Sequence, residues 1–65
     1  MKLQIKDSGA WRNVASFDKE RSDAVLTTGA ALLAALNRTG TSMRVTDGDC
    51  VLSYCEAPAY LWRMA

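Results

Sequence analysis

The segment from Asp23 to Asn37 constrains the fold most, because it is the only stretch long and apolar enough to supply half of a core. Its apolar residues recur at the i, i+3, i+4 and i+7 spacing of an amphipathic helix that lies on a sheet. The predicted inward stripe consists of Val25, Leu26, Gly29, Leu32, Leu33 and Leu36. A glycine inside a helix costs about 1 kcal/mol relative to alanine, so Gly29 predicts a close approach of the helix backbone to its neighbour.

The opposite side of this helix carries no charge from Ala24 to Asn37, whereas a solvated helix back normally carries Lys and Glu. Two interpretations remain open. Alanine is simply the best helix former, or this side of small residues meets a second helix, in a homodimer or in a partner. The side consists of Ala24, Thr27, Ala31, Ala34 and Ala35.

The chain has 65 residues, which predicts one domain spanning positions 1–65. A domain this short buries only about 60% of its unfolded surface, so its own core is marginal. Cys50 and Cys55 fall in one predicted strand, where their Cα atoms would lie about 16 Å apart, beyond disulfide reach. We therefore expect two free thiols and a reducing compartment. Two cysteines without a histidine do not fill a tetrahedral zinc site, so no metal and no cofactor is expected.

The charges nearly balance, since eight basic and seven acidic residues give a net charge of +1. Bulk electrostatics therefore does not predict a nucleic-acid binder, and any such role depends on how the charges are distributed. The segment from Met1 to Lys6 has no apolar signal-peptide core, and no apolar run approaches the roughly 20 residues of a membrane span. These features predict a cytoplasmic protein that makes no membrane contact.

Residues 3–17 predict a β-hairpin with a three-residue loop, Asp7-Ser8-Gly9, whose glycine takes the left-handed bulge position. This register pairs Ile5 with Trp11 and Leu3 with Asn13. It places Leu3, Ile5, Trp11, Ala15 and Phe17 on the inner face, and Lys2, Gln4, Arg12, Val14 and Ser16 on the outer face. Asn13 is the weak point of this register, because it is a polar residue on the inner face.

Residues 41–55 predict a second hairpin with a two-residue turn at Asp47-Gly48, which is the strongest short hairpin pattern in the chain. The predicted turn pairs Val45 with Cys50 and Met43 with Leu52. One face then carries Thr41, Met43, Val45, Cys50, Leu52 and Tyr54, and the other carries Ser42, Arg44, Val51, Ser53 and Cys55.

The ends of these elements have their own patterns. Asp18 suits the N-cap of the helix, and either Gly40 or Asn37 supplies the left-handed residue that ends it. Pro58 ends the second hairpin because it cannot donate to a ladder, and residues 60–64 then predict a short last strand at an edge. The predicted fold class is α+β, with one helix on one face of a mainly antiparallel sheet of four or five strands, in the order ββαββ and a short fifth strand.

Catalytic residues are scarce. The chain has no histidine, and neither cysteine has a predicted base or cation beside it. Asp47 and Asp49 flank the glycine of a tight turn, where aspartate is favoured for hydrogen bonds to its own backbone. The four glycines form no phosphate-binding loop. The sequence therefore predicts no catalytic site and no enzyme.

Two surfaces are candidates for partner binding. The first is the outer sheet face, where the two registers place Lys2, Gln4, Arg12 and Arg44 without an acidic neighbour. The second is the C-terminal tail with Tyr60, Trp62 and Arg63, the residue types of interface hot spots. The alternatives are a solvated sheet face and a Trp62 side chain that folds back to complete a small core.

The hairpin, helix and hairpin layout, with the strand 43–46, the answering strand 51–54 and the aromatic tail 61–63, resembles small phage-encoded anti-CRISPR proteins, particularly inhibitors of type I Cascade complexes. The resemblance is one of pattern and covers the second half of the chain best, so no residue role is carried over. It implies a non-enzymatic inhibitor that binds a host protein complex, a CRISPR effector, in the bacterial cytoplasm and blocks its nucleic-acid binding. The alternative is a small nucleic-acid-binding protein, either a monomer or a homodimer joined through the helix back.

Overall fold

The computed structural model describes residues 1–38 and 40–65 of the chain. Its elements follow one another as two strands, a helix preceded by a short 3₁₀ turn, and three more strands. They are β1 (Lys2–Asp7), β2 (Ala10–Ser16), the 3₁₀ turn η1 (Lys19–Arg21), α1 (Ser22–Leu36), β3 (Ser42–Asp47), β4 (Cys50–Glu56) and β5 (Leu61–Met64).

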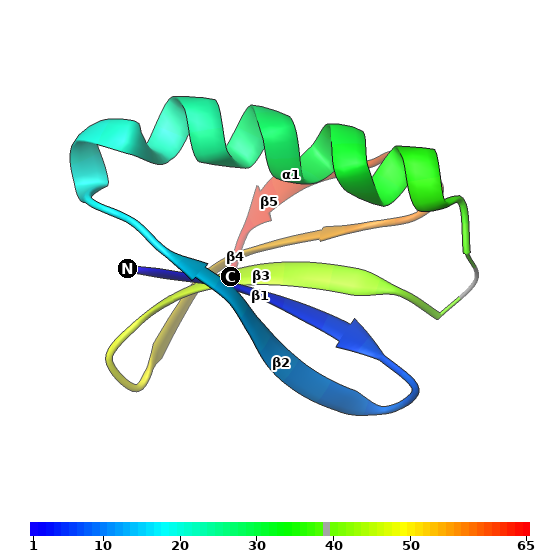
Figure 1. The fold of residues 1–65 in the computed structure, drawn as a ribbon, viewed down its shortest axis with the longest axis horizontal. Helices are drawn as coiled ribbons and strands as arrows, with labels where there is room; N and C mark the ends of the chain where they lie inside the picture. The colour runs from blue at the N-terminus through cyan, green and yellow to red at the C-terminus, as the bar shows by residue number, and fades with distance from the viewer. Residues whose placement is uncertain (39) are drawn as a thin grey trace.

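The five strands form one sheet in the order β2-β1-β3-β4-β5, and every neighbouring pair is antiparallel. The helix α1 lies across one face of this sheet, and the other face stays open (Figure 1). The predicted α+β class, with one helix on a mainly antiparallel sheet, is confirmed, and the short fifth strand is present at the edge. None of the helices in residues 1–38 and 40–65 has the length and apolar character that crossing a membrane requires.

The helix lies close to the sheet at Gly29. A Cβ atom built on Gly29 would sit 3.3 Å from Met43 Sδ and 3.4 Å from Trp62 Cζ2, so a side chain there would force its neighbours apart. This confirms the close approach predicted from the glycine. Gly29 and Leu33 are the buried residues of α1, whereas Leu32 is 44% exposed. The helix is therefore rotated slightly from the predicted stripe, toward Leu33 and away from Leu32.

The two ends of the helix differ from one another in how well they were predicted. Asp18 precedes the 3₁₀ turn rather than α1 itself, and its side chain makes no capping hydrogen bond. Asn37 is the left-handed C-cap, with φ of 47°, and its N–H donates to the carbonyl oxygen of Leu33 over 3.2 Å. Of the two predicted exits, Asn37 therefore ends the helix.

The first hairpin has a tighter turn than predicted. Asp7 pairs with Ala10, and the two turn residues Ser8 and Gly9 have φ of 62° and 88°, the positive angles of a type I′ turn. A two-residue loop shifts the register by one position relative to a three-residue loop, which turns the side chains of β2 to the opposite face. A bulge beyond Asn13 then adds one residue and restores the predicted side for the pair of Leu3 and Ala15.

The second hairpin turns one residue later than predicted. Gly48 and Asp49 form the turn, with φ of 60° at Gly48, the first-position glycine typical of a type II′ turn. A bulge between Val51 and Ser53 leaves Leu52 as the extra residue. Beyond the bulge every β4 side chain lies on the face opposite to its predicted one. The predicted pairs of Val45 with Cys50 and Met43 with Leu52 are therefore wrong.

The core lies between α1 and the inner face of the sheet. Its fully or nearly buried apolar side chains are Leu3, Leu33, Met43, Val45 and Cys55. The observed register explains why Cys55 belongs to this set, since Cys55 pairs with Met43 and lies on the helix side. Both cysteines are free thiols, as predicted.

Candidate functional site

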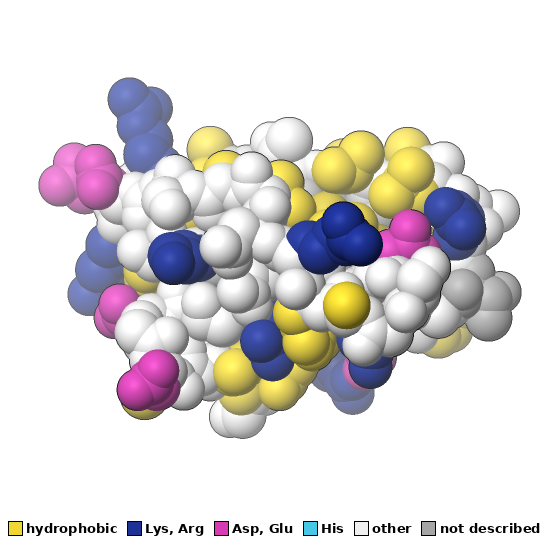
Figure 2. All heavy atoms as spheres, turned by 60° about the horizontal axis from the view of Figure 1, so that its bottom comes forward, with side chains coloured by type: hydrophobic (Ala, Val, Ile, Leu, Met, Phe, Trp, Pro, Cys, Tyr) yellow, Lys and Arg dark blue, Asp and Glu magenta, His cyan; other side chains and the backbone are white. Residues whose placement is uncertain are grey.

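The outer sheet face, which is the face turned away from α1, carries aromatic and basic side chains together. Directly paired residues of antiparallel strands point to the same side of a sheet, so the strand register shows which residues share this face. Three cross-strand rows run over it. The first holds Lys2, Thr46 and Val51, the second Asn13, Gln4, Arg44, Tyr54 and Arg63, and the third Trp11, Lys6, Ser42, Glu56 and Leu61. Figure 2 shows basic side chains spread over this side of the molecule, with hydrophobic atoms between them.

A chain of side-chain hydrogen bonds fixes the centre of this face. Gln4 Nε2 donates to Asn13 Oδ1 over 2.8 Å, and Arg44 Nε donates to Gln4 Oε1 over 2.7 Å. The Arg44 guanidinium lies over the Trp11 ring, 4.2 Å from its centroid, and Lys6 Nζ lies 5.9 Å from the same centroid. Both distances fall within the range of cation–π attraction. Three strands thus hold Trp11 and Arg44 in one defined arrangement.

The surface around Trp11 is hollowed. A shallow depression of about 380 Å³ is lined by Lys6, Trp11, Ser42, Arg44, Tyr54 and Glu56. Glu56 is the acidic residue of this face, and its Oε1 accepts a hydrogen bond of 2.6 Å from Arg63 Nη2. Since Arg63 balances this carboxylate, Lys2, Lys6 and Arg44 give the face a net positive charge.

Three of the four residues predicted on the outer face lie there, and one prediction is wrong. Lys2, Gln4 and Arg44 lie on the outer face, because they belong to rows that the bulges leave in place. Arg12 pairs with Ile5, which packs against the core, so Arg12 projects on the helix side of the sheet. The cause is the two-residue turn, which exchanges the faces of Arg12 and Trp11.

The C-terminal tail is divided between the two faces. Trp62 pairs with Cys55 on the helix side, and its Nε1 donates a hydrogen bond of 2.7 Å to the carbonyl oxygen of Leu26. Trp62 therefore completes the core, which was the alternative to a partner-binding role. Arg63 pairs with Tyr54 and joins the outer face. Tyr60 is half-buried, packs against the core and lies before β5.

The predicted helix back is exposed. Ala24, Thr27, Ala31, Ala34 and Ala35 all lie on the solvent side of α1. Their position agrees with both interpretations of the sequence, a solvated alanine-rich helix and a surface that meets another chain.

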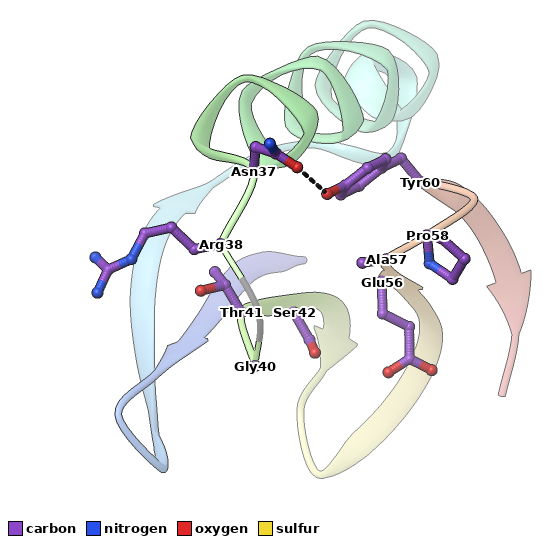
Figure 3. Close-up of a pocket in the computed structure, with 9 residues that line it drawn as sticks. All are labelled: Asn37, Arg38, Gly40, Thr41, Ser42, Glu56, Ala57, Pro58 and Tyr60. Carbon is purple, nitrogen blue, oxygen red and sulfur yellow. Dashed lines mark hydrogen bonds between the residues drawn. The ribbon is translucent and has the colours of Figure 1, made fainter.

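A cavity of about 430 Å³ opens between the C-terminal end of α1 and the segment that joins β4 to β5 (Figure 3). Across it, the Tyr60 hydroxyl donates a long hydrogen bond of 3.5 Å to Asn37 Oδ1. Thr41 Oγ1 is buried without a hydrogen-bond partner among the described residues. Arg38 and Glu56 also line the cavity. Among the described residues, the groups that line it do not include a nucleophile hydrogen-bonded to a base.

The thiols and carboxylates form no reactive or metal-binding cluster in the described parts of the chain. Burial, and to a smaller extent the charge of Glu56, raises the pKa of the Cys55 thiol, which keeps it protonated and unreactive. Cys50 is exposed beside the second turn. Within residues 1–38 and 40–65, no three side chains of the metal-ligating types come together.

Sequence reasoning missed Trp11, Lys6 and Tyr54 as members of the outer face. The polar Asn13 on the predicted inner face was the one indication that the first register was off by a residue. Moving the register by one position places Asn13 opposite Gln4 and brings Trp11 to the outer face. Nothing comparable pointed to the bulge at Leu52, which turns Tyr54 outward.

The fold and this surface define a small α+β domain with an aromatic and basic sheet face. Comparison of the chain with protein-family models, with curated proteins and with solved structures finds no match in any of the three.

Proposed function

We propose that this chain is a small non-catalytic interaction protein that binds a host protein complex through the outer sheet face and blocks the nucleic-acid binding of that complex. The observation that carries the proposal is the ordered pair of Trp11 and Arg44. Tryptophan, tyrosine and arginine are the residues that dominate binding energy at protein interfaces. Here they stand together on an open face, around a depression that a partner side chain can enter.

The fixed positions of these side chains support a binding role. A long arginine side chain normally loses rotamer freedom when it binds, at a cost of roughly 0.5–1.5 kcal/mol. Arg44 is already held by Gln4 and by the Trp11 ring, so little of that freedom is left to lose. The positive charge of the face favours a partner surface that is acidic, and such complementarity speeds association and selects the partner.

A protein partner of this kind agrees with the resemblance to anti-CRISPR inhibitors, and the proposal includes that the chain acts in the cytoplasm of a bacterial host. The balance of charges also favours a protein over a nucleic acid. The net charge of +1 is small for a protein whose affinity depends on displacing counterions from phosphates.

The test is capture from bacterial lysate that has been treated with nuclease. Immobilised wild-type chain is expected to retain a defined protein complex, identified by mass spectrometry. Arg44→Glu and Trp11→Ala should each reduce its retention at least tenfold, while far-UV circular dichroism shows the fold intact. Arg12→Glu is the matched control, because Arg12 lies on the other side of the sheet and its reversal should leave retention unchanged. Equal capture by wild type and Arg44→Glu would exclude the outer face as the binding surface.

A second function has one observation in its favour. Trp11 and Tyr54 on an open sheet face, beside Lys6 and Arg44, also suit the stacking of unpaired bases along a phosphate backbone. If the partner is single-stranded nucleic acid, a labelled oligothymidine should bind with an affinity that falls steeply with salt. Fluorescence anisotropy over a salt series measures this, and a salt-independent or undetectable signal would reject the nucleic-acid function.

A further inference from the structure

The helix side of the sheet is only half covered. Neighbouring strands lie about 4.8 Å apart, so five strands span about 20 Å, which is the width of two packed helices of about 10 Å each. This sheet has five strands and one helix, and the closest strand contacts of α1 are with β3 and β5. At the β2 edge of the sheet, no second helix of residues 1–38 and 40–65 covers the strands.

An apolar groove marks this uncovered half. It has a volume of about 510 Å³ and runs between α1 and β2, with Leu3 at its floor. Val14 and Leu32 lie on its walls and are 46% and 44% exposed, although both are large aliphatic residues. Phe17 and Val25 complete its apolar lining.

The surface area of the chain is consistent with an incomplete core. A folded monomer of 7.1 kDa is expected to expose about 4,100 Å². This chain exposes 4528 Å², about a tenth more.

The same chain also carries the complement of the groove. The back of α1 has no charge from Ala24 to Asn37, and Ala31 lies at its centre. The charged residues that line the groove are Asp18 and Arg21, which are opposite in sign and leave it without net charge. A groove without net charge suits an uncharged helix back, and it gives no attraction to the polyanion or acidic surface that suits the outer sheet face.

We propose that two copies of this chain form a homodimer in which the two α1 helices lie side by side between the two sheets, with the back of each α1 in the groove of the other copy. The two outer sheet faces then point away from each other and stay accessible. The dimer does not depend on the proposed function, since it uses the opposite side of the sheet.

The contact area of the two helix backs approaches what a specific dimer needs. A helix of 15 residues is about 22 Å long and about 10 Å wide, so each helix back meets a strip of roughly 200 Å². Two such contacts, with two surfaces each, remove roughly 800 Å² from water, and the contact between the two helices adds to this toward the roughly 1,000 Å² that a specific interface needs.

The test is the mass of the chain in solution, measured by sedimentation equilibrium from micromolar to near-millimolar concentration. The wild-type mass should rise from 7.1 kDa toward twice that value. Ala31→Glu on the helix back and Val14→Lys in the groove should each hold the mass near 7.1 kDa over the same range. Ala59→Glu, the same change in an exposed loop, should leave the dimer intact, and circular dichroism should show all three variants folded.

A mixture distinguishes this dimer from other arrangements. When Ala31→Glu and Val14→Lys chains are mixed, the dimer should return, because the new glutamate meets the new lysine in one contact and the other contact remains wild type. A wild-type mass that stays at one chain would overturn the proposal. So would a dimer that Ala31→Glu disrupts but Val14→Lys does not, since that result would mean that two helix backs meet directly.

Discussion

Replacing Trp62 with phenylalanine tests whether this residue holds the helix to the sheet. In the folded chain its Nε1 donates a hydrogen bond of 2.7 Å to the Leu26 carbonyl, and its ring packs against Gly29. The carbonyl keeps its own helical partner when the indole is lost, so the missing hydrogen bond costs about 1 kcal/mol. The smaller ring leaves a gap beside Gly29 that adds about 0.5–1 kcal/mol. The expected loss is therefore about 1.5–2 kcal/mol.

For a domain of this size the loss corresponds to a fall in Tm of roughly 6–16 °C, measurable by far-UV circular dichroism. Wild type and variant should be compared at one chain concentration, because self-association would make Tm depend on concentration. Leu61→Ala serves as the control, since Leu61 is 69% exposed and its truncation should change stability by less than about 0.5 kcal/mol. A variant with unchanged Tm but reduced partner capture would refute the structural role and return Trp62 to the binding surface.

Four further predictions concern other parts of the chain. A thiol reagent at neutral pH should label Cys50 quickly and Cys55 only after denaturation, counted by absorbance as one and then two thiols per chain. Burial raises the pKa of the Cys55 thiol in the folded chain, so the unfolded chain loses this proton at a lower pH than the folded chain does. The free energy of unfolding should therefore fall as the pH rises above the ordinary thiol pKa, and a urea midpoint that is constant in alkali would contradict this. Asn37→Ala should lower the free energy of unfolding by about 1 kcal/mol, whereas Asn37→Gly should not, because φ at this position is 47°. Equal urea midpoints for the two variants would show that the left-handed cap is unimportant. Gly29→Val should lower the free energy of unfolding, measured with urea, by about 2–3 kcal/mol, because even a Cβ atom built on Gly29 lies 3.3 Å from Met43 Sδ. A stabilised variant would mean that the helix can move away from the sheet.

Local patterns in the chain were sufficient to predict the elements. Apolar periodicity placed the helix within one residue at either end, at Ser22–Leu36 against the predicted 23–37. Two turn glycines, one proline and the alternating tail placed all five strands. Gly29 predicted the close approach of helix and sheet because only a missing side chain allows it. These features depend on residues near one another in sequence, which is why the sequence alone determined them.

The candidate site was only partly predictable, because it depends on the register. Trp11 and Arg12 are neighbours in the chain, and a turn shorter by one residue exchanges their faces. The bulge at Leu52 does the same for Tyr54 and Cys55. A turn or bulge of this kind changes local energy little, so the sequence did not distinguish the alternatives.

Packing across the whole sheet makes that choice. With Cys55 inward, it pairs with Met43 beneath α1, and Trp62 reaches the Leu26 carbonyl. With Tyr54 outward, it joins Arg44 in the row that supports the outer face. The sequence determined which elements form and which residue types could bind a partner. Only the tertiary structure decided which of them share a face, because side-chain direction in a strand has a period of two and is set by contacts between segments far apart in the chain.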